Sequence, residues 1–304
     1  MDTENFSPLA VLLLLVLLMM VGAGISNGLG YLYAQWQGQD LPALLQSFGE
    51  NSPLAERNLL RVVNLFSQLF IFTASALTLV GMIYKHHWKR YLRLDRSPSL
   101  HIYSASILFI FGIFILSQFM YWLNQQLPLP EWADSMEGKA SEMIKGLLVM
   151  NSPGEFLLTL LVVAVLPAIG EELVFRGVIQ QQLEIATRRP AAAVWLAAFI
   201  FSAFHLQFAG FLPRLLLGAG LGYLYLWTRS LWVPITAHFF INGMQIAGQY
   251  IRKNALAEST IEEVNWWATG LAVLLIAGLS YYLYHHYITK IKPGEPETNP
   301  DFWP

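Results

Sequence analysis

The chain has 304 residues, of which 55% are hydrophobic and 12% are charged, and its formal net charge is -2. Soluble domains carry about 25% charged residues, so this composition excludes an ordinary soluble protein. The lack of a basic surplus excludes a nucleic-acid-binding surface. The sequence has no cysteine, which excludes disulfide frameworks, thiolate metal sites and a cysteine nucleophile. Because the apolar residues gather in long runs, a lipid bilayer is expected to surround most of the chain.

Helices that cross a bilayer need about 20 mostly apolar residues. This criterion predicts an all-α, multi-pass integral membrane protein with about eight transmembrane helices. The predicted spans are Pro8 to Ala34, Val62 to Tyr84, Ile102 to Leu123, Phe156 to Gly177, Trp195 to Leu212, Leu215 to Thr228, Leu231 to Tyr250 and Trp266 to Tyr287. The first run is kept as a span because it is too long for the core of a cleavable signal peptide.

Basic residues in short loops predict the orientation, because they accumulate on the cytoplasmic side. The densest basic cluster follows the second predicted span. It consists of Lys85, Lys89, Arg90, Arg93 and Arg96. Both termini are therefore expected in the cytoplasm. The acidic stretch from Leu127 to Glu155 is expected to be an external loop that carries a short amphipathic helix.

Ionisable residues inside a span cost about 2.5 to 3.5 kcal/mol each on insertion scales, so each one is a candidate functional residue. Few residues pass this filter, and all of them lie in the fourth, fifth and seventh predicted spans. They are Glu171, Glu172, Arg176, His205 and His238, together with the polar Asn242.

Spacing indicates which of these side chains can meet. Glu172 and Arg176 are four residues apart, on one helix face and in the favourable order for an ion pair. Glu171 points about 100° away from Glu172 and faces another group. Glu171 lies 17 residues before Arg188, and His205 lies 17 residues after it, so an antiparallel pair of spans brings both to one depth.

The seventh predicted span adds two polar groups at the same level. His238 is seven residues from the start of its span at Leu231, which is about 10 Å at 1.5 Å per residue. Asn242 lies one turn further along the same face as His238. Four polar side chains are therefore predicted to converge on one level of the membrane.

Three segments resemble the motifs of a known family. Gly170 to Gly177 resembles E-E-x-x-x-R, Phe201 to His205 resembles F-x-x-x-H, and His238 to Asn242 resembles H-x-x-x-N. In this order, the motifs are typical of the CAAX-protease and bacteriocin-processing (CPBP) family of intramembrane endopeptidases. The resemblance covers about Phe156 to Gln249.

This resemblance implies hydrolysis of a peptide bond by activated water, without a cofactor. Glu171 would be the general base, and His205 would hold and polarise the water. His238 and Asn242 would donate hydrogen bonds to the oxyanion. The expected partners are a peptide or protein substrate, which enters from the membrane or the cytoplasm, and the bilayer, with no nucleic acid.

The motifs also divide the chain into four parts. Residues 1–150 are an N-terminal three-helix membrane region with its external loop, and residues 151–250 are the CPBP-like catalytic core, in spans four to seven. Residues 251–291 contain the last transmembrane helix. Residues 292–304 are proline-rich and are expected to be a disordered tail.

Other interpretations of the polar residues stay open. Glu171, His205 and His238 match the His₂Glu ligand set of a hydrolytic zinc site, although the chain lacks H-E-x-x-H. The same side chains suit a non-catalytic scaffold or immunity protein of this fold. They also suit a proton-coupled transporter, although no internal repeat supports one. Glu172 and Arg176 are interpreted as a structural ion pair.

Overall fold

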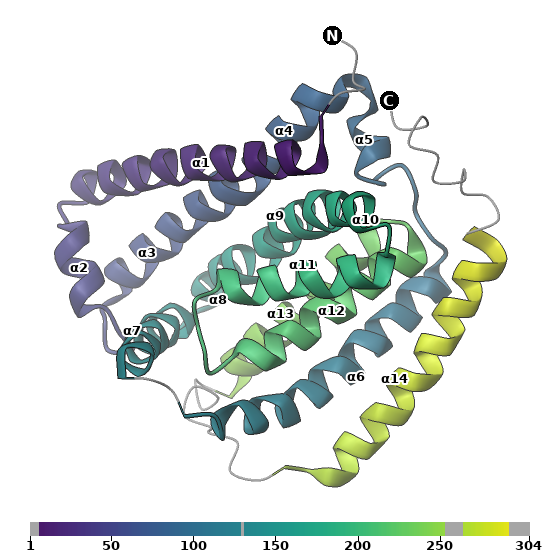
Figure 1. Cartoon of the computed structure of the whole chain (residues 1–304). Helices are drawn as coiled ribbons and strands as arrows, with labels where there is room; N and C mark the ends of the chain where they lie inside the picture. Colours follow the sequence, from purple (N-terminus) through teal and green to yellow (C-terminus); the bar gives the residue numbers. More distant parts are fainter. Residues whose placement is uncertain (1–5, 129–130, 253–263, 292–304) are drawn as a thin grey trace.

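A computed structural model describes residues 6–128, 131–252 and 264–291, and the regular structure in these ranges is helical (Figure 1). The helices are α1 (Pro8–Trp36), α2 (Leu41–Ser47), α3 (Leu54–Ser67), α4 (Ser75–Tyr84), α5 (Trp88–Tyr91), α6 (Leu100–Gln125), α7 (Glu131–Leu148), α8 (Pro153–Leu160), α9 (Leu166–Val174), α10 (Gln181–Thr187), α11 (Pro190–Phe204), α12 (Phe211–Thr228), α13 (Trp232–Ile251) and α14 (Trp266–His286). The all-α class predicted from the sequence is confirmed.

Several of these helices join end to end through π-helical turns. The segment Gln68–Ala74 links α3 to α4, Leu161–Val165 links α8 to α9, and Phe175–Gln180 links α9 to α10. A π-helical turn changes which face of a helix its flanking residues present, and such turns are frequent at functional sites. The helix of the fourth predicted span thus carries one π-helical turn on each side of α9.

Within the described residues, five helical stretches are long and apolar enough to cross a membrane, which agrees with a multi-pass membrane protein. They are Pro8–Trp36, Leu54–Tyr91, Leu100–Gln125, Pro153–Thr187 and Trp266–Ile291. Helix α11 is apolar but shorter, and the remaining predicted spans correspond to α12 and α13. The orientation of the termini stays a prediction, as does the division into four parts. The predicted tail, residues 292–304, lies outside the described residues.

The boundaries differ from the prediction in the fifth span. A continuous helix was predicted from Trp195 to Leu212, but α11 ends at Phe204 and α12 begins at Phe211. Leu206 has a positive φ of 52°, which a helix does not accommodate. The chain therefore turns back immediately after the F-x-x-x-H segment.

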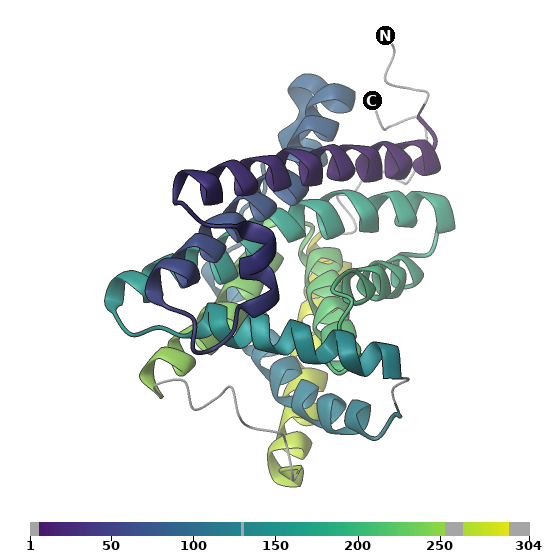
Figure 2. The same cartoon turned by 90° about the vertical axis from the view of Figure 1, so that its left-hand side faces the viewer.

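The stretch predicted as an external loop contains the 18-residue helix α7. Helix α7 runs across the side of the bundle that faces the viewer in Figure 2. Its Met143 and Leu147 pack against the buried residues Leu44 and Phe48 in the N-terminal part of the chain. This packing fixes α7 against the first helices.

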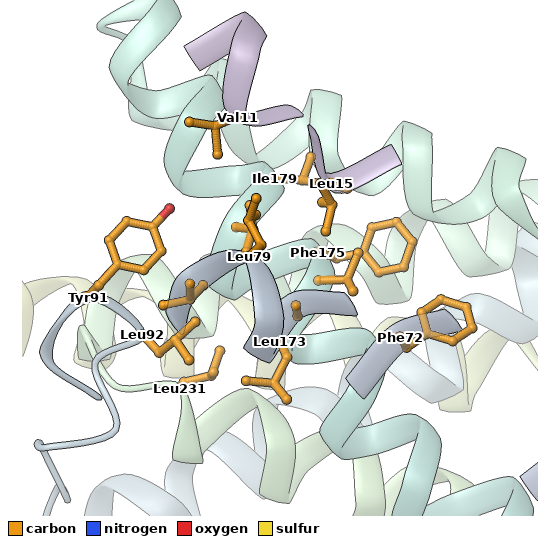
Figure 3. Close-up of a cluster of buried hydrophobic side chains, with 14 of the residues drawn as sticks. Val11, Leu15, Phe72, Leu79, Tyr91, Leu92, Leu173, Phe175, Ile179 and Leu231 are labelled. Carbon is orange, nitrogen blue, oxygen red and sulfur yellow. The ribbon is translucent and has the colours of Figure 1, made fainter. Parts of the chain in front are cut away.

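Two hydrophobic clusters form most of the core, and one of them holds α9. One joins α1, α4 and α9 through residues such as Leu15, Leu79 and Leu173 (Figure 3). The other joins α6, α11, α12 and α13 through residues such as Ile110 and Leu224. Close helix approach on this side depends on glycines, because a Cβ on Gly218 would lie 3.3 Å from the Ala198 backbone. Such small residues are typical of helix contacts in membranes.

A buried ionic cluster ties α3 to α8. Glu155 Oε1 accepts hydrogen bonds from Arg57 Nη2 at 2.7 Å and from Arg61 Nη1 at 3.0 Å. Glu155 Oε2 accepts the Asn151 N–H at 2.9 Å. Arg61 also donates to the backbone carbonyls of Leu147 and Val149. One carboxylate therefore pairs with two buried guanidinium groups.

The first prediction concerns this cluster. Glu155→Gln should lower the free energy of unfolding by about 3 kcal/mol, because it leaves Arg57 and Arg61 buried without their counter-ion. Thermal unfolding in detergent micelles measures the change. The exposed carboxylate of Glu142, which pairs with Lys145, provides the control, since Glu142→Gln should cost less than about 1 kcal/mol. Equal effects of the two substitutions would contradict the assignment.

Candidate active site

The four side chains predicted to converge do line one cavity. The cavity has a volume of about 440 Å³, and its walls include Glu171 of α9, His205 after α11, and His238 and Asn242 of α13. Apolar residues from α6, α7 and α12 complete the walls. Three separate helical segments thus bring a carboxylate, two imidazoles and an amide to one enclosed space.

The position of Glu171 depends on close helix packing at the preceding residue. A Cβ on Gly170 would lie 2.8 Å from Thr73 Oγ1 and 3.0 Å from Phe72 Cβ. The absence of a side chain lets α9 approach the π-helical segment that contains Gln68. The Gln68 side chain lies next to the Glu171 carboxylate and lines the same cavity.

Glu172 is fully buried and forms the centre of a polar cluster. Its Oε1 accepts hydrogen bonds from Arg176 Nη1 at 2.6 Å and from His238 Nδ1 at 2.8 Å. Arg176 Nη2 donates to the Gly218 carbonyl of α12 at 2.8 Å, and its guanidinium lies 5.0 Å from the centre of the Phe201 ring. The cluster thus connects α9 with α12 and α13.

His238 lies between the two neighbouring glutamates. Its Nδ1 bonds to Glu172, and its Nε2 is 4.0 Å from Glu171 Oε2. Glu172 accepts as a carboxylate, so Nδ1 carries the proton in this bond. The sequence did not indicate this contact, because helical spacing relates residues on one helix and not on two.

Asn242 is held by a backbone carbonyl of the π-helical segment Leu161–Val165. Its Nδ2 donates to the Val163 carbonyl at 3.1 Å. In a regular helix, this carbonyl would accept from the N–H four residues later, but that residue is Pro167, which has none. One N–H of the Asn242 amide remains available to the cavity.

His205 is oriented by its own helix. Its Nδ1 lies 2.9 Å from the Phe201 carbonyl, which fixes Nδ1 as the donor and leaves Nε2 as an acceptor in the neutral ring. The Phe201 ring lies 5.0 Å from the His205 ring and 6.3 Å from the His238 ring. Phe201 therefore packs near both histidine rings.

Other polar residues line the cavity that were not predicted from the sequence as site residues. They are Asn64, Gln68, Gln207, Arg214 and Gln245. Asn64 and Gln68 are four residues apart in an apolar span, and Gln245 follows Asn242 by three, so polar residues at helical spacing were a usable signal. Gln207 and Arg214 had no such signal, because the turn between α11 and α12 was predicted as helix.

A zinc site requires ligands within about 2.0 to 2.2 Å of one point. In the described part of the chain, no group of three or more histidine or acidic side chains is arranged to hold a metal ion. Both histidines do have Nδ1 bonded to an acceptor, which also orients metal-bound histidines. The zinc alternative for Glu171, His205 and His238 is addressed by an experiment below.

Comparisons with known proteins agree with the motifs. Residues 153–244 match the family model described as type II CAAX prenyl endopeptidase Rce1-like. This segment contains all three motifs, so the match supports the CPBP resemblance seen in the sequence. The family that this segment resembles is one of CAAX-type proteases.

A curated relative gives a second match. The uncharacterized protein YpbD of Bacillus subtilis (strain 168) is 33% identical over 109 residues, which are 34% of this chain and 50% of YpbD. The chain thus spans about half the length of this relative. No solved structure matches the chain.

The second prediction tests the Glu172 cluster. Glu172→Gln should lower the free energy of unfolding by about 3 to 5 kcal/mol, because it leaves Arg176 buried without a counter-ion. Glu171→Gln, a substitution of the same chemistry at the adjacent residue, should cost clearly less, since the Glu171 carboxylate is 4.0 Å from His238 Nε2 and forms no close ion pair with it. Thermal unfolding in detergent measures both variants. A larger loss for Glu171→Gln would overturn this division.

Proposed function

We propose that the protein is an intramembrane endopeptidase that hydrolyses a peptide bond with water activated by Glu171 and His205. The observation that carries the proposal is the cavity lined by Glu171, His205, His238 and Asn242. The match of residues 153–244 to a family model of CAAX-type endopeptidases supports the reaction class. The substrate is a peptide or protein that reaches the cavity from the membrane or the cytoplasm.

Glu171 is assigned as the general base rather than Glu172 because of its surroundings. Glu171 lines the cavity, whereas Glu172 is not among the lining residues and binds Arg176 and His238. A base must lie within hydrogen-bond reach of the water that it deprotonates. Glu171 takes one proton from the water, and Nε2 of His205 accepts a hydrogen bond from the other O–H.

The oxyanion forms when the water oxygen adds to the peptide carbonyl. Its charge is stabilised by donors fixed in advance, which we assign to the remaining N–H of Asn242 and to His238. Because Nδ1–H of His238 is donated to Glu172, the ring donates through Nε2 only when it carries a second proton. The C–N bond then breaks, and Glu171 returns its proton to the leaving amine.

The third prediction follows from the base assignment. Glu171→Gln should abolish hydrolysis, because an amide cannot take the proton, and it should leave the protein folded. The measurement is the cleavage of a mixed pool of internally quenched peptides by the purified protein in detergent, with thermal unfolding as the check on folding. Glu142→Gln, on the exposed face of α7, is the control and should keep full activity.

The outcomes separate the proposal from its rivals. Full activity in Glu171→Gln would remove the proposed role of this residue. If the wild-type protein cuts no peptide in detergent or in liposomes, a non-catalytic scaffold or a transporter becomes the better interpretation of the same cavity.

The fourth prediction separates glutamate catalysis from zinc catalysis. We expect the active protein to contain no stoichiometric transition metal and to resist strong chelators. We also expect His238→Gln to keep a trace of activity, since an amide still donates to an oxyanion. Elemental analysis and activity after chelation are the measurements. Stoichiometric zinc, together with activity that is lost on chelation and restored by added metal, would show that zinc activates the water in place of Glu171 and His205. The assignment of the protein as a peptidase would stand.

A further inference from the structure

The cavity carries one permanent positive charge. Among its lining residues, Arg214 is the single lysine or arginine, and Glu171 is the single carboxylate. Arg214 lies in the first turn of α12, which begins at Phe211 after the N-cap residue Gly210. The amino end of a helix disfavours a cation, so this position stabilises the guanidinium poorly without an anion.

The hydrogen bonds of Arg214 leave part of the guanidinium unused. Nη1 donates to Gln207 Oε1 at 2.9 Å, and Nη2 donates to the Gln207 backbone carbonyl. Nε is buried and has no hydrogen-bond partner within the described residues. Both acceptors are neutral, so the bonds orient the group without neutralising it.

Nearby acidic groups do not form an ion pair with Arg214. Glu137 of α7 acts on it electrostatically, but Glu137 Oε2 accepts the Ala209 N–H at 3.3 Å. Among the carboxylates whose side chains the structure describes, none forms an ion pair with Arg214 within 4.0 Å. A partly buried charge without a directly paired counter-ion is costly, so a bound anion would stabilise it.

The local backbone is shaped around the guanidinium. A Cβ on Gly210 would collide with the Arg214 side chain, so the glycine provides the space that the group occupies. Asn124 of α6 holds this turn at two points, with Nδ2 2.9 Å from the Phe208 carbonyl and Oδ1 3.0 Å from the Leu212 nitrogen. The guanidinium is therefore positioned before any ligand arrives, which reduces the entropy lost on binding.

We propose that Arg214 is a specificity-determining residue that binds a carboxylate of the peptide held in the cavity. This inference rests on the proposed function. A guanidinium binds a carboxylate through paired, charge-assisted hydrogen bonds. The carboxylate belongs either to the carboxyl terminus of the peptide or to an aspartate or glutamate side chain. The negative charge of Glu171 repels it from the other part of the cavity, so the two charges orient the peptide.

Binding to a protein that cannot cut tests this proposal. In a Glu171→Gln background, three pools of short peptides, each labelled with an uncharged dye that has no carboxylate, are compared by fluorescence polarisation. The first pool has a free carboxyl terminus and no acidic side chain, and the second has a carboxyl-terminal amide and one internal aspartate. The third has the amide and no acidic side chain. Added Arg214→Gln should weaken at least one carboxylate pool by about tenfold or more, and the third pool by no more than about twofold.

The first two pools distinguish the sources of the carboxylate. Arg214→Lys keeps the charge but loses the paired geometry. Its affinity for the carboxylate pool should therefore lie between the affinities of the Glu171→Gln protein and of the variant with added Arg214→Gln. It also tests the proposal if Arg214→Gln fails to fold. Gly210→Ala should weaken the same pool, because the added Cβ displaces the guanidinium. Arg90→Gln, at an exposed position outside the cavity, is the matched control and should change no pool.

Two results would overturn the inference. One is an equal loss for all three pools in Arg214→Gln, and the other is binding of the carboxylate pools no tighter than the neutral pool. Either result leaves the peptidase assignment standing if the wild-type protein cuts peptides. Conversely, carboxylate binding that depends on Arg214 stands even if no peptide is cut.

Discussion

The site depends on one buried carboxylate, that of Glu172. A charge with 0% exposure is stable only when it is paired and hydrogen-bonded, and Glu172 Oε1 meets this need with Arg176 and His238 together. Arg176 extends the contact to the Gly218 carbonyl. The helices α9, α12 and α13 are therefore fixed relative to each other at the level of the cavity.

The same contact gives the two adjacent glutamates different roles. Neighbouring residues on a helix point about 100° apart, so the face that buries Glu172 against α13 leaves Glu171 in the cavity. The His238 ring, held at Nδ1 by Glu172, directs Nε2 toward Glu171 at 4.0 Å. The glutamate of the stabilising ion pair and the candidate catalytic base thus occupy consecutive positions. Arg214 places a positive charge in the same cavity as Glu171.

The sequence predicted the convergence of Glu171, His205, His238 and Asn242 because helical periodicity and depth in a membrane both follow from residue spacing. It did not predict the bond between His238 and Glu172, since the rotation of one helix against another depends on packing that a single sequence does not encode locally. The break after α11 was also missed, because Leu206 is apolar and carries no turn signal. With that break, the positions of Gln207 and Arg214 were missed as well.

The coupling between Glu172 and His238 is the most direct test of this account. The measurement is a double-mutant cycle with Glu172→Gln, His238→Gln and the double variant, read as free energies of unfolding in mixed micelles. Side chains that share a hydrogen-bonded network show interaction energies of about 0.5 to 3 kcal/mol, so we expect at least about 1 kcal/mol. Additive effects, within about 0.5 kcal/mol, would mean that α9 and α13 do not meet at this pair and would contradict the arrangement of the site.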